Sequence, residues 1–481
     1  MDSISKIDSI TEEYGVDQAA TGSAQPEPVV SVRGLVKRYG SREAVAGIDL
    51  EVRRGEIFAF LGPNGAGKTT TVEILEGFRQ RTQGQVSVLG HDPATAGGAW
   101  RDRVGVVLQE SEPEPGLSVR ECLAMYAGLY RAPRDIGETL DLVGLTGQAG
   151  ALSTRLSGGQ RRRLDFALAL IGDPELIFLD EPTTGFDPSA RRAAWQVIAG
   201  LRKLGKTIFL TTHYLDEAEY LADRITVLSA GHIVAEGTPQ TLGGRDHMAT
   251  AISFTLPGHV RTGDLPPGLG PAGRARAGRI DRHAQRQPAR PPADPRRLGA
   301  RPRLRPSRSR RPPPDPGGGL PLPHRARDQE GSAMIRMALH LFGYDLRAFL
   351  RNRQWQFFTI ALPVLFLVIF ASVFGGSGHT TAVAGGRIST SVYYVPGIIA
   401  LGIIAACFGN LVASVTAQRE RGVLKRRRAT PVPAAAVIAG RVLTAVVVAV
   451  VMAAVLLGIG WAAYGAHVPG RTALALAVTV V

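Results

Sequence analysis

The nine residues Gly62-Pro63-Asn64-Gly65-Ala66-Gly67-Lys68-Thr69-Thr70 give the clearest indication of fold in this chain of 481 residues. Their spacing is that of a phosphate-binding loop, in which four residues separate two glycines and a lysine and a threonine follow. Lys68 can reach the β- and γ-phosphates of a nucleotide, and the Thr69 hydroxyl can ligate Mg²⁺. The alternative is a chance glycine turn, which the complete motif disfavours.

The flanking residues supply the strand and the helix that such a loop needs. Residues 57–61 are apolar and bulky and predict a buried strand, while Val72, Ile74 and Leu75 predict a helix with an apolar side. A glycine loop between the two leaves main-chain N–H groups free at the positive end of the helix. The sequence therefore predicts a phosphate site at this point.

Short apolar runs alternate with helical patterns through residues 29–247, which predicts an α/β domain. One helical pattern is Leu215, Ala218, Leu221 and Ile225. Residues 1–28 are polar and predict a disordered tail. Besides residues 57–61, the expected strands are 104–108, 176–179 and 207–211.

A net charge of +15 resembles that of a nucleic-acid-binding protein, but most of the excess lies in one segment. Residues 255–333 hold 17 arginines and no lysine against six acidic residues. No aromatic residues are interleaved there for stacking on bases, so no nucleic-acid partner is expected. The charge therefore belongs to a low-complexity segment and not to a folded face.

Residues 248–333 predict a disordered linker rich in Arg and Pro. One interpretation is a basic segment that lies on anionic lipid head groups. Another is that a frameshift joined two adjacent genes, because these residues have GC-rich codons and Met334 begins a segment that resembles a new protein start.

Residues 334–481 predict a membrane domain. Uncharged apolar runs at 357–374, 392–415 and 434–464 are long enough to cross a bilayer, and a fourth starts at residue 472 and is cut short. Arg441 lies near the start of the third run, where it can reach the interface. Buried core helices are the alternative, which three such runs in succession disfavour.

Basic residues orient these spans. Only Arg387 lies between the first two spans, so the flanks rich in Arg and Lys are expected on the cytosolic side. They are Arg347, Arg351 and Arg353 before the first span, and Arg419, Arg421, Lys425, Arg426, Arg427 and Arg428 before the third.

A second phosphate site is predicted at Ser157-Gly158-Gly159-Gln160, directly before a helix that starts near Arg161. Its main-chain N–H groups lie at another positive helix end. A plain helix cap is the alternative. Two such sites exceed the need of one nucleotide, which indicates that two copies of the domain share each ATP.

Three further strands end in residues suited to phosphate chemistry, and ligands gather at the carboxyl ends of parallel strands. Asp180 can hold Mg²⁺ and Glu181 can orient or deprotonate the attacking water. His213 can contact the γ-phosphate, and Gln109 can contact Mg²⁺ or water. For the acids, the alternative is a solvated loop; for His213 it is a structural role, and for Gln109 an ordinary surface position.

Together these motifs resemble the nucleotide-binding domain of ABC transporters over about residues 29–240. The resemblance makes 62–70 the Walker A loop, Gln109 the Q-loop, 156–160 the signature and 176–180 Walker B. It implies Glu181 as the catalytic base, His213 as the switch histidine, Tyr39 as the aromatic that stacks on adenine, and 185–187 as the D-loop, with Phe186 where Leu is commoner. It implies ATP and Mg²⁺ as cofactors and a head-to-tail pair of domains.

Within the family, the chain resembles antibiotic-resistance ATPases of the daunorubicin type, and residues 334–481 resemble the start of a type-2 ABC permease. The expected fold is a P-loop α/β domain followed by a partial all-α transmembrane domain. The expected function is ATP-driven export of a hydrophobic compound across the cytoplasmic membrane, with ABC permease subunits as partners. Alternatives are export of a lipid or polysaccharide, a non-transport ABC ATPase, and a membrane interaction protein whose ATPase regulates assembly.

Overall fold

The computed structural model describes residues 28–109, 111–242, 273–276, 279–282, 324–374, 380–383, 386–389, 397–398, 400–402, 404 and 410–464. The predicted tail and fourth span lie outside these residues, except for Pro28, as do most of the predicted linker and second span. The chain divides into two compact units, residues 240–323 and the remainder. The described residues of the smaller unit form one antiparallel hairpin, β10 (Gly273–Arg276) with β11 (Arg279–Arg282).

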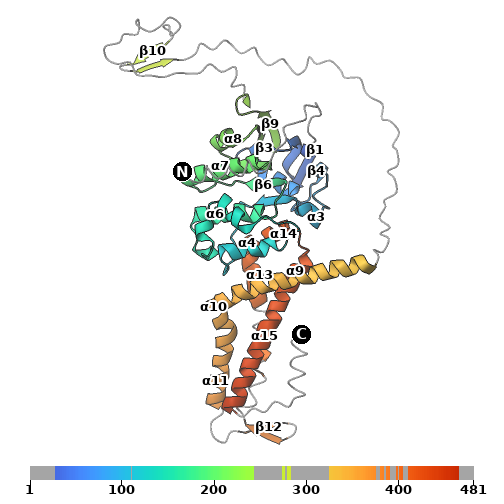
Figure 1. The fold of residues 1–481 in the computed structure, drawn as a ribbon, viewed down its shortest axis with the longest axis vertical. Coiled ribbons are helices and arrows are strands. Elements are labelled where there is room, and N and C mark those ends of the chain that lie inside the picture. Colours follow the sequence, from blue (N-terminus) through green and yellow to red (C-terminus); the bar gives the residue numbers. More distant parts are fainter. Residues whose placement is uncertain are drawn as a thin grey trace. The chain divides into compact units, whose positions relative to one another are not determined.

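Two sheets form the N-terminal part of the larger unit (Figure 1). One is antiparallel, with the order β2-β1-β4. The other has the order β5-β6-β7-β3-β8-β9 and is parallel except at β8–β9. The strands are β1 (Pro28–Tyr39), β2 (Arg42–Arg53), β3 (Ile57–Leu61), β4 (Gln83–Val88), β5 (Val104–Val107), β6 (Leu176–Asp180), β7 (Thr207–Thr212), β8 (Arg224–Ser229) and β9 (His232–Gly237).

Helices cover these sheets, and several begin at a side chain that caps the first turn. Ser118 and Ser157 each form a capping box with the glutamate or glutamine three residues on, and Asp187 caps α7 with Pro188 in the first turn. The helices are α2 (Lys68–Leu75), α3 (Gly98–Arg101), α4 (Val119–Ala127), α5 (Ile136–Leu142), α6 (Gly158–Leu170), α7 (Pro188–Lys203) and α8 (Leu215–Leu221), with 3₁₀ turns at Thr146–Gln148 and Ser153–Arg155.

Three phenylalanine side chains in register fix the central strands of the parallel sheet. Phe209 on β7 pairs with Phe58 on β3 and with Phe178 on β6. Its ring centroid lies 5.3 Å from that of Phe58 and 5.6 Å from that of Phe178. All three rings are fully buried, and each such burial contributes about 1.5–3 kcal/mol. The carboxyl ends of β3, β6 and β7 are thereby held side by side.

Two local predictions were wrong. Ile225 does not continue the helix of Leu215, because α8 ends at Leu221 and Ile225 lies in β8. Asp223 ends the helix: its N–H donates to the Ile57 oxygen, and its carboxylate accepts from the Ile57 N–H at 2.9 Å. The helix expected near Arg161 begins at Gly158, since the Ser157 capping box starts it three residues earlier.

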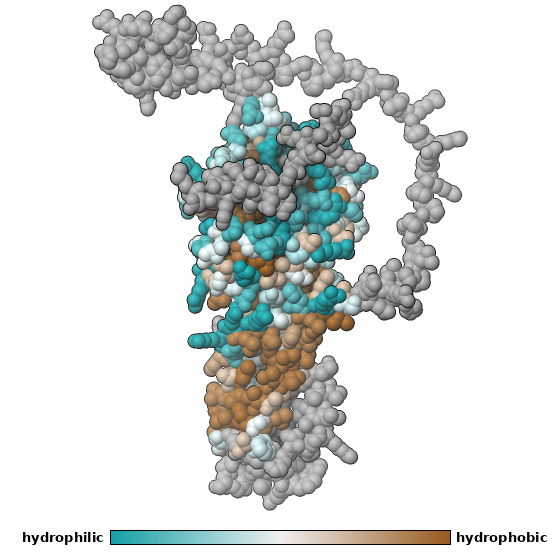
Figure 2. Space-filling model, viewed as in Figure 1, coloured by the Kyte–Doolittle hydropathy of each residue, from teal (hydrophilic) through white to brown (hydrophobic). Residues whose placement is uncertain are grey.

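The C-terminal part of the larger unit is helical apart from one hairpin. The helix α15 matches the predicted third span and is the one helix among the described residues that is long and apolar enough to cross a membrane. Apolar surface gathers over α11 and α15 (Figure 2). The elements are α9 (His324–Arg351), α10 (Arg353–Gln356), a π-helical turn (Phe357–Ala361), α11 (Leu362–Phe374), β12 (Thr380–Val383), β13 (Gly386–Ser389), α13 (Asn410–Glu420), α14 (Val423–Ala429) and α15 (Ala434–Tyr464).

Arg441 does not reach toward an interface as predicted. Its side chain is buried and donates to the amide oxygen of Gln418 on α13. A guanidinium needs an acceptor when it leaves water, and Gln418 of α13 supplies one.

Candidate active site

The phosphate-binding loop joins β3 to α2, and two of its glycines are required by the surrounding backbone. Gly67 caps α2 with φ at 109°, a left-handed conformation that side chains disfavour. A Cβ at Gly67 would also overlap the main-chain oxygen of Ala44, and one at Gly62 would overlap that of Leu228. The loop therefore packs against β2 and β8 too tightly for any residue but glycine at these two positions.

Lys68 lies in the first turn of α2 and is 4% exposed. Its ammonium donates to the carbonyl oxygens of Gly62 at 2.7 Å and Pro63 at 3.2 Å, and lies 3.3 Å from Glu181 Oε1. The loop thus folds around a buried cation. A phosphate group fits such a site, because it brings negative charge to the ammonium and to the positive end of α2.

Glu181 directly follows β6 and has a strained backbone, with φ at 45°. Thr211 on the neighbouring β7 holds this turn: both its carbonyl and its hydroxyl accept from the Glu181 N–H, at 3.2 and 3.0 Å. The same hydroxyl donates to Asp180 Oδ1 at 2.5 Å. The register that pairs Asp180 with Thr211 therefore positions both acids.

The Glu181 carboxylate lies among three groups that favour its charged form. Lys68 contacts one oxygen; the other accepts from the Thr184 hydroxyl at 3.1 Å and lies 3.2 Å from His213 Nδ1. His213 Nδ1 makes no aligned hydrogen bond at this distance. Burial raises the pKa of Glu181, but Lys68, His213 and Thr184 outweigh it and hold that pKa below the ordinary value.

The structure brings Lys68, Glu181 and His213 together and places Asp180 beside them. Thr69 is exposed in the first turn of α2, and Gln109 is exposed after β5. Burial raises the pKa of Asp180, and Glu181 adds to the shift against the hydrogen bond from Thr211. One oxygen of the nearby buried Glu76 has no hydrogen-bond partner. Asp180 and the Thr69 hydroxyl are oxygen donors of the kind that Mg²⁺ prefers, and the described residues include no group of three or more Asp, Glu, His or Cys side chains that could hold a metal ion by themselves.

Arg162 on α6 is a site residue that the sequence reasoning missed. Its buried guanidinium donates to the main-chain oxygens of Leu108 at 2.5 Å, Asp180 at 3.2 Å and Pro182 at 2.9 Å. It also lies 3.5 Å from the oxygen of Gln109 and 3.4 Å from that of Glu181. One side chain thus ties together the ends of β5 and β6. The sequence held no clear signal for it, because Arg162 lies on the side of the helix opposite to the apolar pattern of Leu164, Ala167, Leu168 and Ile171.

The sequence reasoning also missed Thr211, although the sequence held a signal for its role. The predicted strand 207–211 ended in threonines beside the acids of β6, and a hydroxyl at a strand end is suited to orient a neighbouring carboxylate.

The motif residues Ser157–Gln160 form the N-terminus of α6. The Ser157 hydroxyl accepts from the Gln160 N–H at 3.3 Å, and the Gln160 side chain accepts from the Ser157 N–H at 3.0 Å. Ser157 and Gly158 are exposed. This helix end therefore faces solvent with its first-turn N–H groups, and its recorded polar contacts, within the described residues, do not include Lys68 or Glu181.

Tyr39 ends β1 and is 43% exposed. Lys37 and Arg79 lie 5.1 and 5.4 Å from its ring centroid, and Arg79 also donates to its hydroxyl. The ring is thus held in place while much of it stays open to solvent.

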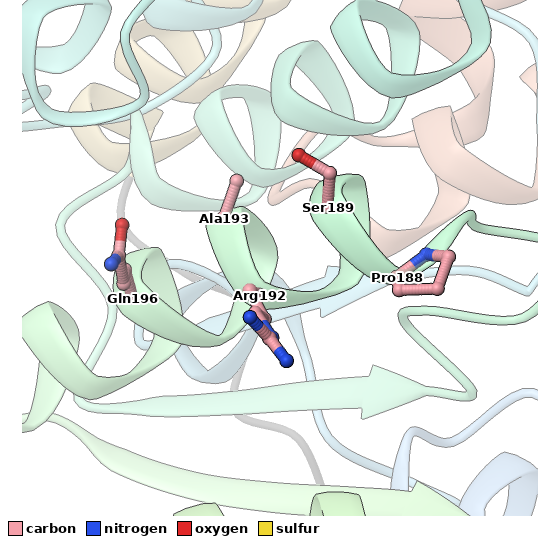
Figure 3. A pocket seen from close by; sticks show the side chains of 5 residues that line it. All are labelled: Pro188, Ser189, Arg192, Ala193 and Gln196. Atoms are coloured by element: carbon pink, nitrogen blue, oxygen red, sulfur yellow. The ribbon is translucent and has the colours of Figure 1, made fainter.

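An open hollow of about 500 Å³ lies on α7, after the D-loop residues (Figure 3). It is lined by Pro188, Ser189, Arg192, Ala193 and Gln196. None of the predicted phosphate-site residues lines it, so we assign the chemistry to the loop and strand ends and not to this hollow.

Both parts of the chain match known protein families. Residues 45–184 match the ABC transporter family, and residues 339–481 match the ABC-2 type transporter family. A daunorubicin resistance ATP-binding protein of Streptomyces coeruleorubidus is 42% identical over 221 residues, which are 45% of this chain and 70% of that protein. The chain belongs to the ABC transporter ATP-binding proteins.

Other relatives are named for the export of a different compound. The Nod factor export ATP-binding protein I of Rhizobium meliloti is 41% identical over 230 residues, 47% of this chain and 69% of that protein. A solved ATP-binding subunit of an ABC transporter is 27% identical and covers 44% of this chain and 90% of its own, with a TM-score of 0.41.

The ABC transporter chain is therefore an ATPase of type-2 exporter architecture. Its P-loop domain, which we call the ATPase domain (residues 28–242), is fused to a membrane domain of the ABC-2 type (the described residues of 324–464, here the permease part).

Proposed function

We propose that this chain couples ATP hydrolysis at the Lys68–Glu181 site to export of a hydrophobic compound across the cytoplasmic membrane. The observation that supports it most strongly is the Glu181 carboxylate, which contacts Lys68, Thr184 and His213 at the edge where β3, β6 and β7 end. No other residue among those described combines a carboxylate held in its charged form with direct contact to the P-loop lysine.

The residues supply binding, orientation and proton transfer. Lys68 exchanges the Gly62 and Pro63 carbonyls for β- and γ-phosphate oxygens, which frees one oxygen of Glu181. Glu181 then accepts a proton from the attacking water as the bond to the γ-phosphorus forms and the bond to the bridging oxygen breaks. His213 donates to the γ-phosphate. The main-chain N–H groups of residues 62–70 hold the phosphates.

Asp180, Thr69 and Gln109 would hold Mg²⁺. When bound, the ion neutralises charge on the β- and γ-phosphate oxygens. The chain's own contribution is the Thr211 hydroxyl, which holds Asp180 through one carboxylate oxygen, Oδ1.

The signature residues Ser157–Gln160 serve a second copy of the domain. Their exposed helix end offers N–H groups to a phosphate, and the hydrogen bonds given for them among the described residues are those of the capping box and of the first turn of α6. We infer a head-to-tail pair, in which each nucleotide lies between the Walker A loop of one copy and the signature of the other. In that arrangement Tyr39 stacks on adenine.

The ATPase domain lies on the cytosolic side. Lys425, Arg426 and Arg427 precede the span of α15 and contact the ATPase domain directly, which agrees with the tendency of cationic flanks to stay in the cytosol. As the exported compound we propose a hydrophobic drug, by similarity to the daunorubicin resistance relatives. A second candidate is a lipid or polysaccharide, since the Nod factor export relatives are almost equally similar.

Transport in inverted membrane vesicles tests the proposal. With ATP, vesicles that contain the chain should accumulate daunorubicin, and vesicles with Lys68→Ala should not. An equal and ATP-independent uptake in both would refute export of such compounds. If the chain hydrolyses ATP but the vesicles take up no drug and the drug does not stimulate hydrolysis, the second candidate substrate is favoured.

A further inference from the structure

Two adjacent arginines of α14 are buried against the ATPase domain. Arg426 is 6% exposed and Arg427 is 2% exposed. Arg426 donates to Asp165 on α6 and to the Ser111 hydroxyl. Arg427 donates to Glu114 at 2.8 Å and, on its other side, to Asp345 of α9 at 3.0 Å. Each arginine therefore enters a separate acidic site.

The acids on the ATPase side are as deeply buried as the arginines. The side chains of Asp165 and Glu114 are 6% and 5% exposed. Glu114 is itself fixed from the ATPase side, where Tyr126 donates to its carboxylate at 3.4 Å and Ser153 to its carbonyl at 2.7 Å. These acids thus form a preformed surface, which we call the acid pair.

Arg427 keeps its charge despite its burial. Burial acts to lower the pKa of Arg427, but Asp345 and Glu114 outweigh it and hold that pKa well above the ordinary arginine value. Removing one member of such a pair leaves the other charged and unsolvated, which is strongly unfavourable.

The other contacts of α14 and of the residues that flank it discriminate less. Lys425 contacts Glu73 at 2.7 Å and Arg421 contacts Glu112 at 3.6 Å, but these cations are 38% and 48% exposed. Exposed pairs contribute little to stability. The apolar contacts of Val423 and Val432 would accept other apolar side chains. A permease that does not match must therefore be rejected by the buried charged groups, because these are strongly unfavourable when they have no ion-pair partner.

We propose that Asp165 and Glu114 are the surface by which the ATPase domain selects its permease, and that the matching partner is a cytosolic helix with two adjacent arginines. Together with contacts of α9 such as that of Arg351 with Glu121, this contact, and not the covalent connection through residues 240–323, holds the two parts of the chain together. The membership of the family does not assign these residues, and the inference holds for any exported compound.

A cleavable full-length chain tests this directly. A protease site is placed between residues 240 and 323, the chain is purified in detergent and cut, and the dissociation of the permease fragment from the tagged ATPase fragment is measured. The wild-type fragments should stay together. Arg426→Gln and Arg427→Gln should each raise the dissociation constant at least about tenfold. Arg421→Gln, at an exposed position just before α14, should change it less than about threefold.

A double-mutant cycle separates a direct pair from general damage. Asp165→Asn combined with Arg426→Gln should weaken binding no more than either change alone, and the same should hold for Glu114→Gln with Arg427→Gln. Nucleotide binding by each ATPase variant is the folding control. If an ATPase variant no longer binds nucleotide, the two arginine variants alone test the proposal, since their substitutions leave the ATPase domain unaltered.

Three results would overturn the proposal: separation of the wild-type fragments on cutting, undiminished binding by both arginine variants, or losses that multiply in the double variants. The readout is fragment association and needs neither hydrolysis nor transport. Its failure is therefore distinct from failure of the proposed export function.

Discussion

Lys68 and Glu181 form a buried ion pair, with 3.3 Å between Nζ and Oε1 and both side chains less than one-tenth exposed. The pair joins the loop after β3 to the end of β6, across the intervening β7. Phosphate and carboxylate compete for the same ammonium, so nucleotide binding and release of the Glu181 carboxylate are one event. The proposed base is thereby held away from water until the substrate displaces it.

Glu181→Gln should lower the rate of ATP hydrolysis by at least about 100-fold, because the amide keeps the shape of the side chain but cannot accept the proton. ATP binding should be retained or strengthened, since the carboxylate no longer competes for Lys68. Phosphate release and equilibrium nucleotide binding measure the two effects. Unchanged hydrolysis would remove Glu181 from the role of base, and Glu236→Gln on the edge strand β9 serves as the control.

Arg162→Gln should destabilise the ATPase domain by about 3 kcal/mol, because it removes the donor for buried carbonyls at the ends of β5 and β6. Hydrolysis should fall more than nucleotide binding, since the Asp180 and Glu181 carbonyls lose their anchor while the P-loop is untouched. The neighbouring Arg163 donates to the Gly144 oxygen at 3.0 Å from an exposed position. Arg163→Gln is the matched control, and equal effects of the two changes on unfolding and turnover would contradict this role of Arg162.

Local sequence predicted most of the ATPase domain because each piece carries its own signal. The glycine spacing at 62–70 and the apolar run before Asp180 are short-range patterns, and both lie where expected. What failed depended on contacts between distant residues. Asp223 ends α8 through its bonds to Ile57, and Arg441 is buried because Gln418 lies beside it. Arg162 and Thr211 were missed for the same reason, since their partners come from other strands.

Gly67→Ala should weaken ATP binding by at least about tenfold. The left-handed conformation costs an alanine roughly 1–2 kcal/mol, and its Cβ would also overlap the Ala44 oxygen, so the loop must shift. Gly205 has φ at 73° but open space around it. Gly205→Ala therefore carries the backbone cost alone and should leave ATP binding unchanged. Equal nucleotide affinity in both variants would show that the close packing on β2 is unimportant.

The ion pair between Glu121 and Arg351 makes stability depend on acid pH. Arg351 donates to both carboxylate oxygens, at 2.5 and 3.0 Å, and this pairing, with help from Ser118 against the effect of burial, lowers the pKa of Glu121 to about 2. A folded-state pKa below the ordinary value stabilises the fold above about pH 4.5, and this stabilisation is lost as the pH falls toward 2.

Glu121→Gln should therefore lower the stability at neutral pH by about 1 kcal/mol, a value reduced by the exposure of Arg351. The difference from wild type should shrink between about pH 4.5 and 2. Thermal unfolding of the two chains across this range measures it. Glu138→Gln, at an exposed position in the first turn of α5, should show no such convergence. A difference that stays constant with pH would refute the assignment to this carboxylate.

Variants of Tyr39 can separate the contribution of its ring to ATP binding from that of its hydroxyl. If adenine stacks on this partly exposed ring, Tyr39→Ala should raise the dissociation constant of ATP about tenfold, since stacking is worth about 0.5–1.5 kcal/mol. Tyr39→Phe keeps the ring and removes only the hydrogen bond from Arg79, so its affinity should stay within about twofold. Binding of inorganic triphosphate, which has no base, should be equal in all three chains. A loss in the phenylalanine variant as large as in the alanine variant would instead assign the role to the hydroxyl and its contact with Arg79.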